Sequence, residues 1–229
     1  MNGVDMGGLF APATAALPGW FGKLPGMGDF AHRRLPDPVR ERWDLWLQNG
    51  LATLRERHAD WQAHYLAGPL WFFVLAQGVA APQPWIGVLM PSVDNVGRYF
   101  PFVVAAELAV PIERLSLADC ERLRDWWALA AGAALDGLEQ DLDAVRFEAL
   151  LARVFLEAIE SDFPETEGDD AGLVEFDDDA TPFRDLPVPG QSLWVTDPAG
   201  GNMGGGARML CADLPWGERF DALFGFPPP

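Results

Sequence analysis

Hydrophobic residues recur at two different spacings along the chain, and the first long run has the spacing of a helix. From Val39 to Leu54 they return every three or four residues, which places them on one face of an amphipathic helix. Asp37 can act as the N-cap, with Pro38 at the first helical position, where a missing N–H costs nothing. The pattern therefore predicts a helix from Asp37, followed by a short second helix capped by Asp60.

Runs rich in aromatic and β-branched residues, bounded by glycine and proline, predict strands. Trp20–Leu24 is expected as an edge strand or as an extended lead into the first helix. The remaining runs form two groups, one in the middle of the chain and one near its end: Leu70–Gln77, Trp85–Met90, Phe100–Leu108, Ser192–Thr196 and Ala207–Cys211.

Helical spacing returns between these two groups of strands and predicts two longer helices. Ser116 followed by Asp119 resembles a capping box and begins the first of them. Asp141 or Asp143 is expected to cap the second. A last short helix is predicted over Trp216–Phe224.

The alternation of helices and strands predicts the fold class. Because the late strands must return to the earlier ones, we expect one α/β domain with helices covering a mixed sheet. Residues 1–17, rich in glycine, alanine and proline, are expected to form a flexible arm. Residues 160–190 break up into Asp, Glu, Gly and Pro, which predicts an acidic surface loop inserted in the domain.

The charge of the chain is strongly negative and unevenly distributed. Of 229 residues, 34 are acidic and 16 are Lys or Arg, which gives a net charge of −18. Residues 1–115 are nearly neutral, whereas Glu157–Asp185 carries 12 acids and one arginine. Such a chain repels nucleic-acid phosphates and anionic membrane surfaces, so neither is an expected partner.

Several features predict a soluble, cytoplasmic protein. The longest apolar stretches, near Leu70–Ala76 and Pro101–Val110, fall short of the roughly 18–20 residues that a membrane helix needs. The residues before Lys23 lack the basic region of a signal peptide. Cys120 and Cys211 form no CxxC motif, so a disulfide framework is not expected.

The chain offers few residues for metal or cofactor chemistry. His58 and His64 are six residues apart, which on one helix places them on different faces, and no Cys/His cluster occurs, so no metal site is predicted. The carboxylates of residues 169–179 could collect Ca²⁺ or Mg²⁺, but they lack EF-hand spacing, and a solvated loop is the simpler interpretation. The glycines of residues 200–206 lack the Lys-Ser/Thr of a P-loop, so no cofactor is expected.

The segment Trp85–Pro101 contains a well-defined connector between two strands. Asp94 and Arg98 lie at a spacing that allows an ion pair across the turn, and Ser92 can bond the backbone two residues on. A hydrolase using Ser92 is a weaker alternative, because G-x-S-x-G is absent and no histidine follows Ser92 in the chain.

A second polar and glycine-rich segment, Gly22–Phe30, reads GKLPGMGDF and contains the only lysine of the chain. Together with two aromatic patterns, these segments resemble the TagF family of accessory proteins of bacterial type VI secretion systems. The motifs that carry the resemblance lie in order along the chain: Gly22–Phe30, Trp43-Asp44-x-Trp46-Leu47, Pro69-x-Trp71-x-Phe73 and Pro91–Pro101. The match is weaker in the second half, where it rests mainly on Ser192-Leu193-Trp194.

The resemblance implies a three-layer αβα sandwich with a mixed, largely antiparallel central sheet and no known catalysis. It also implies a cytoplasmic regulator that represses type VI secretion post-translationally by binding a forkhead-associated scaffold protein of the apparatus, with no small-molecule substrate. A structural subunit of the apparatus is the main alternative, and a hydrolase using Ser92 is a less favoured one.

Charged and polar residues in loops beside apolar elements are the candidates for contact with a partner. On this ground a partner-binding role is predicted for five residues: Arg33, Arg34, Ser92, Asp94 and Arg98. The competing interpretation is that Asp94 and Arg98 form an internal brace that matters only for folding. No catalytic residue is predicted.

Overall fold

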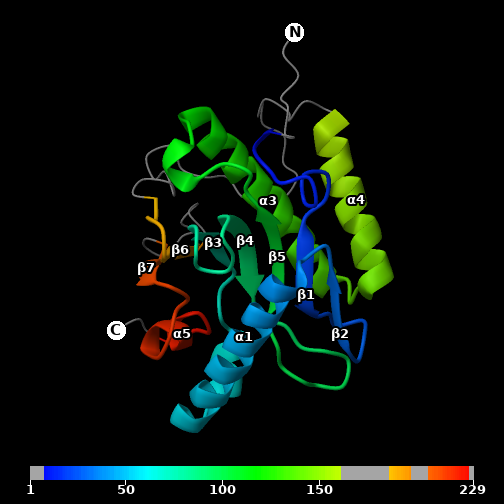
Figure 1. The fold of residues 1–229 in the computed structure, drawn as a ribbon. Helices are drawn as coiled ribbons and strands as arrows, with labels where there is room; N and C mark the ends of the chain where they lie inside the picture. The colour runs from blue at the N-terminus through cyan, green and yellow to red at the C-terminus, as the bar shows by residue number, and fades with distance from the viewer. Residues whose placement is uncertain (1–7, 161–185, 197–205, 227–229) are drawn as a thin grey trace.

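A seven-stranded sheet forms the centre of the molecule (Figure 1). The computed structural model describes residues 8–160, 186–196 and 206–226. Within these residues the strand order is β2-β1-β5-β4-β3-β6-β7. The bounds of the strands are β1 Gly19–Lys23, β2 Phe30–Arg33, β3 Trp71–Leu75, β4 Trp85–Met90, β5 Phe102–Glu107, β6 Gln191–Thr196 and β7 Arg208–Ala212.

The pairing of the strands confirms the α/β class and corrects one detail of the expected sheet. Every described pair of neighbouring strands is antiparallel, so the described sheet is not mixed. The late strands do return to the earlier ones, because β6 pairs with β3. The expectation of an edge strand at Trp20–Leu24 is wrong: β1 is buried along its length and lies between β2 and β5. Strand β2, which no sequence pattern predicted, is the edge strand beside β1.

Helices supply the large apolar side chains that cover the sheet. Their bounds are α1 Asp37–Arg57, α2 Trp61–Leu66, α3 Leu117–Glu139, α4 Ala144–Glu160 and α5 Glu218–Ala222, with a 3₁₀ turn at Ile112–Arg114. Because successive strand residues point to opposite faces, Trp20 and Phe21 of β1 enter two different hydrophobic clusters. The cluster around Trp20 contains residues of α3 and α4, and the cluster around Phe21 contains residues of α1, α2 and α5.

The ends of the helices test the predicted caps. Ser116 and Asp119 form the expected capping box at the start of α3. Asp143, and not Asp141, caps α4, because its Oδ1 accepts hydrogen bonds from the N–H groups of Val145 and Arg146. Neither α1 nor α2 has the predicted side-chain cap; α1 begins at Asp37 with Pro36 before it.

Part of the predicted flexible arm is packed. Leu9 and Phe10 are buried, and Phe10 pairs with Leu108 just after β5. Backbone hydrogen bonds from Ala11 N–H to the Glu107 carbonyl and from Ala109 N–H to the Leu9 carbonyl hold the segment there. Most of the predicted acidic loop and the glycine-rich link, at 161–185 and 197–205, lies outside the described residues.

Candidate functional site

The connector between β4 and β5 folds into a tight turn around Asp94. The Asp94 N–H donates to the Arg98 carbonyl at 3.1 Å, and the Gly97 N–H donates to the Asp94 carbonyl at 3.0 Å. Val93 and Tyr99 pair across the base of the turn. Gly97 has a φ of +81°, a conformation that costs glycine little and other residues more. The sequence Val96-Gly97-Arg98 is therefore suited to this turn.

The Asp94 side chain closes this turn from inside. Its Oδ1 accepts hydrogen bonds from the N–H groups of Val96, at 3.1 Å, and Arg98, at 2.8 Å. The expectation that Ser92 bonds the backbone two residues on is wrong, because the Ser92 hydroxyl donates to the Lys23 carbonyl and the Asp94 N–H donates to the Arg98 carbonyl. An aspartate carboxylate can accept a hydrogen bond from the N–H of the residue two positions later and so stabilise a turn.

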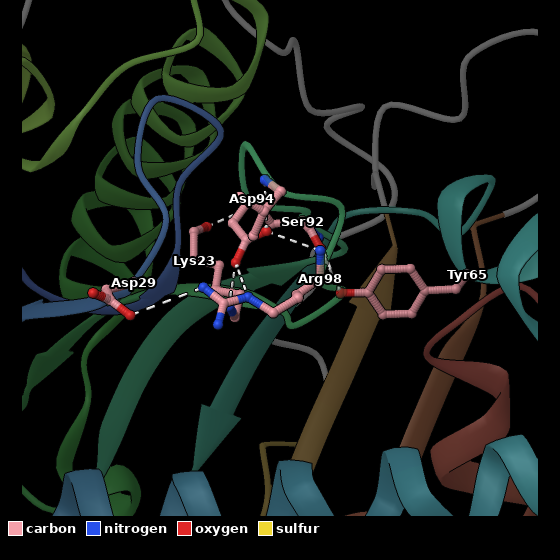
Figure 2. A network of polar contacts seen from close by, with 7 residues as sticks. Lys23, Asp29, Tyr65, Ser92, Asp94 and Arg98 are labelled. Carbon is pink, nitrogen blue, oxygen red and sulfur yellow. Dashed lines mark hydrogen bonds and ion pairs between the residues drawn. The ribbon is translucent and has the colours of Figure 1, made fainter.

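A buried ion pair connects the turn to β1 (Figure 2). The Lys23 Nζ donates to the Asp94 Oδ2, and the two side chains are only 4% and 0% exposed. Lys23 also lies under the ring of Phe30, with Nζ 4.7 Å from the ring centroid. The neighbouring Gly22 permits the close approach of β1 to the connector, since a Cβ there would lie 2.2 Å from the Pro101 carbonyl oxygen.

Arg98 completes the network and extends from it toward solvent. Its Nε donates to the Asp94 Oδ2 at 2.8 Å, which confirms the predicted ion pair, and its side chain is 55% exposed. Burial raises the pKa of Asp94, but the hydrogen bonds from Lys23, Arg98 and Val96 outweigh burial and hold the pKa well below its usual range. Asp94 is thus a carboxylate kept ionised in a buried position.

Ser92 is held by a backbone carbonyl on one side and by a tyrosine hydroxyl on the other. Its hydroxyl donates to the Lys23 carbonyl at 2.8 Å, and its N–H donates to the Tyr65 hydroxyl at 3.0 Å. Tyr65 in turn donates to the Ser92 carbonyl at 3.0 Å, and burial raises the pKa of Tyr65 above its usual range. The described partner of the Ser92 hydroxyl is a backbone carbonyl, which is not a base that could activate a serine nucleophile.

The structure separates the five predicted residues into two groups. Ser92, Asp94 and Arg98 lie in one network, while Arg33 and Arg34 follow each other at the end of β2, close to Trp20. Arg34 binds Glu148 of α4 through both Nη groups and donates from Nε to the Pro18 carbonyl at 2.9 Å.

Glu148 is held from two sides, because the Trp20 Nε1 also donates to it at 2.8 Å. Although partial burial raises the pKa of Glu148, the bonds from Arg34 and Trp20 bring it below its usual value. Arg33 is exposed, and its guanidinium lies 5.7 Å from the Trp20 ring centroid. Arg34 therefore braces β2 against α4, whereas Arg33 remains available at the surface.

Sequence reasoning missed Lys23, Tyr65 and Glu148, which complete these two networks. One feature of the sequence could have pointed to Lys23: it is the only lysine of the chain and follows the apolar Trp20-Phe21-Gly22. Its partner lies 71 residues away, so no local spacing could identify it.

The histidines pack differently from what their spacing suggests. His58 is the C-cap that follows α1, and His64 lies in α2, so the two histidines do not share one helix. Both rings stack on Phe226, with centroids 3.8 and 4.3 Å away. A search of the described residues finds no group of three or more His, Cys, Asp or Glu side chains placed to hold a metal ion.

Comparisons with known proteins give one family and one solved structure to report. A family model described as the TagF N-terminal domain, type VI secretion system-associated, matches residues 19–154. The crystal structure of PA0076 from Pseudomonas aeruginosa PAO1 superposes with a TM-score of 0.64 at 25% identity, covering 90% of this chain and 93% of that one. A search of curated proteins gave no significant match. Of the described helices, none has the length and apolar character needed to cross a bilayer.

Proposed function

The chain belongs to the family of type VI secretion system-associated TagF N-terminal domains, and on that premise we propose that it is a non-catalytic regulator. It represses type VI secretion post-translationally by binding a forkhead-associated scaffold protein of the apparatus in the cytoplasm. The observation that carries this proposal is the family match over residues 19–154, which includes both motif segments joined by Lys23 and Asp94.

The geometry of the network supports binding over catalysis. The hydrogen bonds from Lys23, Val96 and Arg98 to Asp94 fix the loop in one shape, and a fixed loop is a suitable surface for a partner. Ser92 is 2% exposed, and its hydroxyl hydrogen is given to a backbone carbonyl. If a Ser92→Ala variant lost a hydrolytic activity of the wild-type protein, the non-catalytic proposal would be overturned.

The fold proposed for this regulator is the three-layer αβα sandwich. The two hydrophobic clusters support it, because one contains side chains of α3 and α4 and the other contains side chains of α1 and α5. Trp126 and Phe147 represent the first cluster, and Trp43 and Phe220 represent the second. An experimental structure with α1 and α3 on the same face of the sheet would contradict it.

A pull-down from cells carrying a type VI secretion cluster tests the proposed partner. The tagged protein should retain a forkhead-associated protein, and an unrelated tagged protein of similar size and net charge should not. Overproduction of the protein should reduce secretion, and its removal should increase secretion. Retention of other apparatus components without the forkhead-associated protein would overturn the proposed mode of action.

A structural subunit is the second candidate role. Such a subunit would co-purify in fixed stoichiometry with the assembled apparatus, and its deletion would abolish assembly. Because a repressor should have the opposite effect on assembly, the deletion strain distinguishes the two roles.

A further inference from the structure

The buried network leaves one charged group facing solvent. Arg98 uses its Nε for Asp94, and its two Nη groups have no hydrogen-bond acceptor within the part of the chain that the structure describes. The nearest additional carboxylate oxygen paired with it is the Asp29 Oδ1, 3.9 Å from Nη2, and that side chain is 92% exposed. The Nη edge therefore offers two donors in the fork geometry that a carboxylate accepts.

The positive charge of Arg98 is not cancelled by the buried carboxylate. Asp94 is already paired with Lys23, and this pair is shielded from water on both sides. Two cations thus surround one buried anion, and the only other described carboxylate paired with the exposed Arg98 guanidinium is the solvent-exposed Asp29, 3.9 Å away (Figure 2). A guanidinium held at the surface, whose second carboxylate lies 3.9 Å away, favours a further anionic contact.

Two exposed apolar side chains belong to the same network. Phe30 is 47% exposed and packs edge-on against Phe100, with ring centroids 4.7 Å apart, above the Lys23 ammonium. Val96 is 65% exposed in the turn, where its N–H is bound by Asp94. The backbone beneath these side chains is already ordered, so binding of a partner does not carry the entropy cost of ordering it.

We propose that Arg98, Phe30 and Val96 form the contact surface for the partner and that the partner presents a carboxylate flanked by apolar side chains. This inference rests on the proposed function, so the partner is the forkhead-associated scaffold protein. The exposed Arg98 fork, with Phe30 and Val96 beside it, is complementary to a carboxylate of this kind. Ser92 and Asp94 position the surface from below without contacting the partner.

Isothermal titration of the full chain with the purified forkhead-associated protein tests this surface. Arg98→Ala removes the guanidinium fork, and Val96→Asp places a carboxylate beside it. Each change should therefore weaken binding at least about tenfold. Raising the salt from about 0.1 to about 0.5 M should weaken the wild-type complex more than the Arg98→Ala complex. Arg98→Lys should bind more tightly than Arg98→Ala, since it keeps the charge but loses the fork.

Two matched controls separate the surface from general charge effects. Arg42→Ala removes another exposed arginine, which binds Asp213 at 2.7 Å, and Leu45→Asp adds a carboxylate at a 63% exposed position on α1. Both should bind within about twofold of the wild-type protein. Thermal melting of every variant should show that the fold is retained. Treating the partner with phosphatase should leave its binding unchanged, because the proposed anionic group of the partner is a carboxylate and not a phosphate.

Three other outcomes would overturn either the proposed surface alone or the surface together with the proposed function. If the wild-type chain does not bind the forkhead-associated protein, both the proposed function and this surface are wrong. If it binds and the Arg98 and Val96 variants bind equally well, only the surface is wrong. If the wild-type chain is a dimer that Arg98→Ala dissociates, the surface is occupied by a second copy, which also overturns the inference.

Discussion

Two buried aspartates hold distant parts of the chain together, and they do so with different kinds of partner. Asp94 is paired with Lys23, which is itself buried, and it also binds two backbone N–H groups. Asp221 of α5 is paired with Arg57 at 2.6 Å and with His58 at 3.0 Å. The Arg57 and His58 side chains are about one third exposed, at 34% and 30%.

The difference shows which charge the fold depends on more. Removing Asp221 leaves the Arg57 and His58 side chains, which water can reach, whereas removing Asp94 leaves a buried ammonium group beneath the Phe30 ring. Desolvation makes an unpaired buried charge far more costly than an exposed one. Asp94 also lies within the residues that match the family model, and Asp221 lies outside them. The first site thus joins two strands' worth of chain within the residues that match the family model, and the second attaches the C-terminal helix.

The largest expected effect is that of Asp94→Ala. This change leaves Lys23 buried without a counter-ion and should lower the free energy of unfolding by about 3–5 kcal/mol. Urea denaturation measures the loss. Asp29→Ala is the matched control, since its side chain is 92% exposed, and it should change stability by less than about 0.5 kcal/mol. Equal stability of the two variants would contradict a buried, paired Asp94.

Asp221→Ala should have a smaller effect, about 1.5–3 kcal/mol, because its partners remain hydrated when it is lost. Guanidinium or urea denaturation of both aspartate variants under the same conditions compares them. A loss equal to or greater than that of Asp94→Ala would invert the comparison and would indicate that the C-terminal attachment is the more important of the two.

Tyr65→Phe tests the hydroxyl that supports the connector from α2. The change removes both the acceptor for the Ser92 N–H and the donor to the Ser92 carbonyl, and it should cost about 1–2 kcal/mol. Tyr99→Phe is the matched control, because no hydrogen bond of its hydroxyl occurs among the described residues. Similar melting temperatures for the two variants would show that the Tyr65 hydroxyl does not support the turn.

The pH dependence should show the smallest difference between variants. Because the native environment lowers the pKa of Asp94, the unfolded chain takes up a proton at this carboxyl near about pH 4 while the folded chain does not. The stability that Asp94 contributes is therefore complete above that pH and is lost as the pH falls. Relative to Asp94→Asn, the wild-type protein should lose up to about 1.4 kcal/mol more per pH unit below pH 4. If the free energies of unfolding of the two proteins fell in parallel below pH 4, the Asp94 ion pair would be contradicted.

Local sequence signals predicted most of the elements but not the contacts that join them. The capping box at Ser116 and the late strands were recoverable because their signals lie within a few residues. The four-residue strand β2 was missed because its Phe-Ala-His-Arg sequence has little hydrophobic alternation. The position of β1 inside the sheet was missed as well, since nothing in Trp20–Leu24 indicates how many neighbours a strand will have.

The candidate site was predicted in part for the same reason. The Asp94–Arg98 ion pair spans four residues and could be proposed from spacing, whereas the Lys23–Asp94 pair spans 71 and depends on the order of strands in the sheet. Arg34 was expected at the partner surface, and that role stays a prediction, but its described contacts with Glu148 and Pro18 are internal to the fold.

The central claim is that Lys23 and Asp94 act as one unit that joins the two motif segments. A double-mutant cycle with Lys23→Met, Asp94→Asn and the combined variant tests it most directly through urea denaturation. The account predicts that the combined variant is more stable than the sum of the single losses implies, with a coupling free energy of at least about 1.5 kcal/mol. Losses that add within about 0.5 kcal/mol would show that the two residues are independent and would contradict the account.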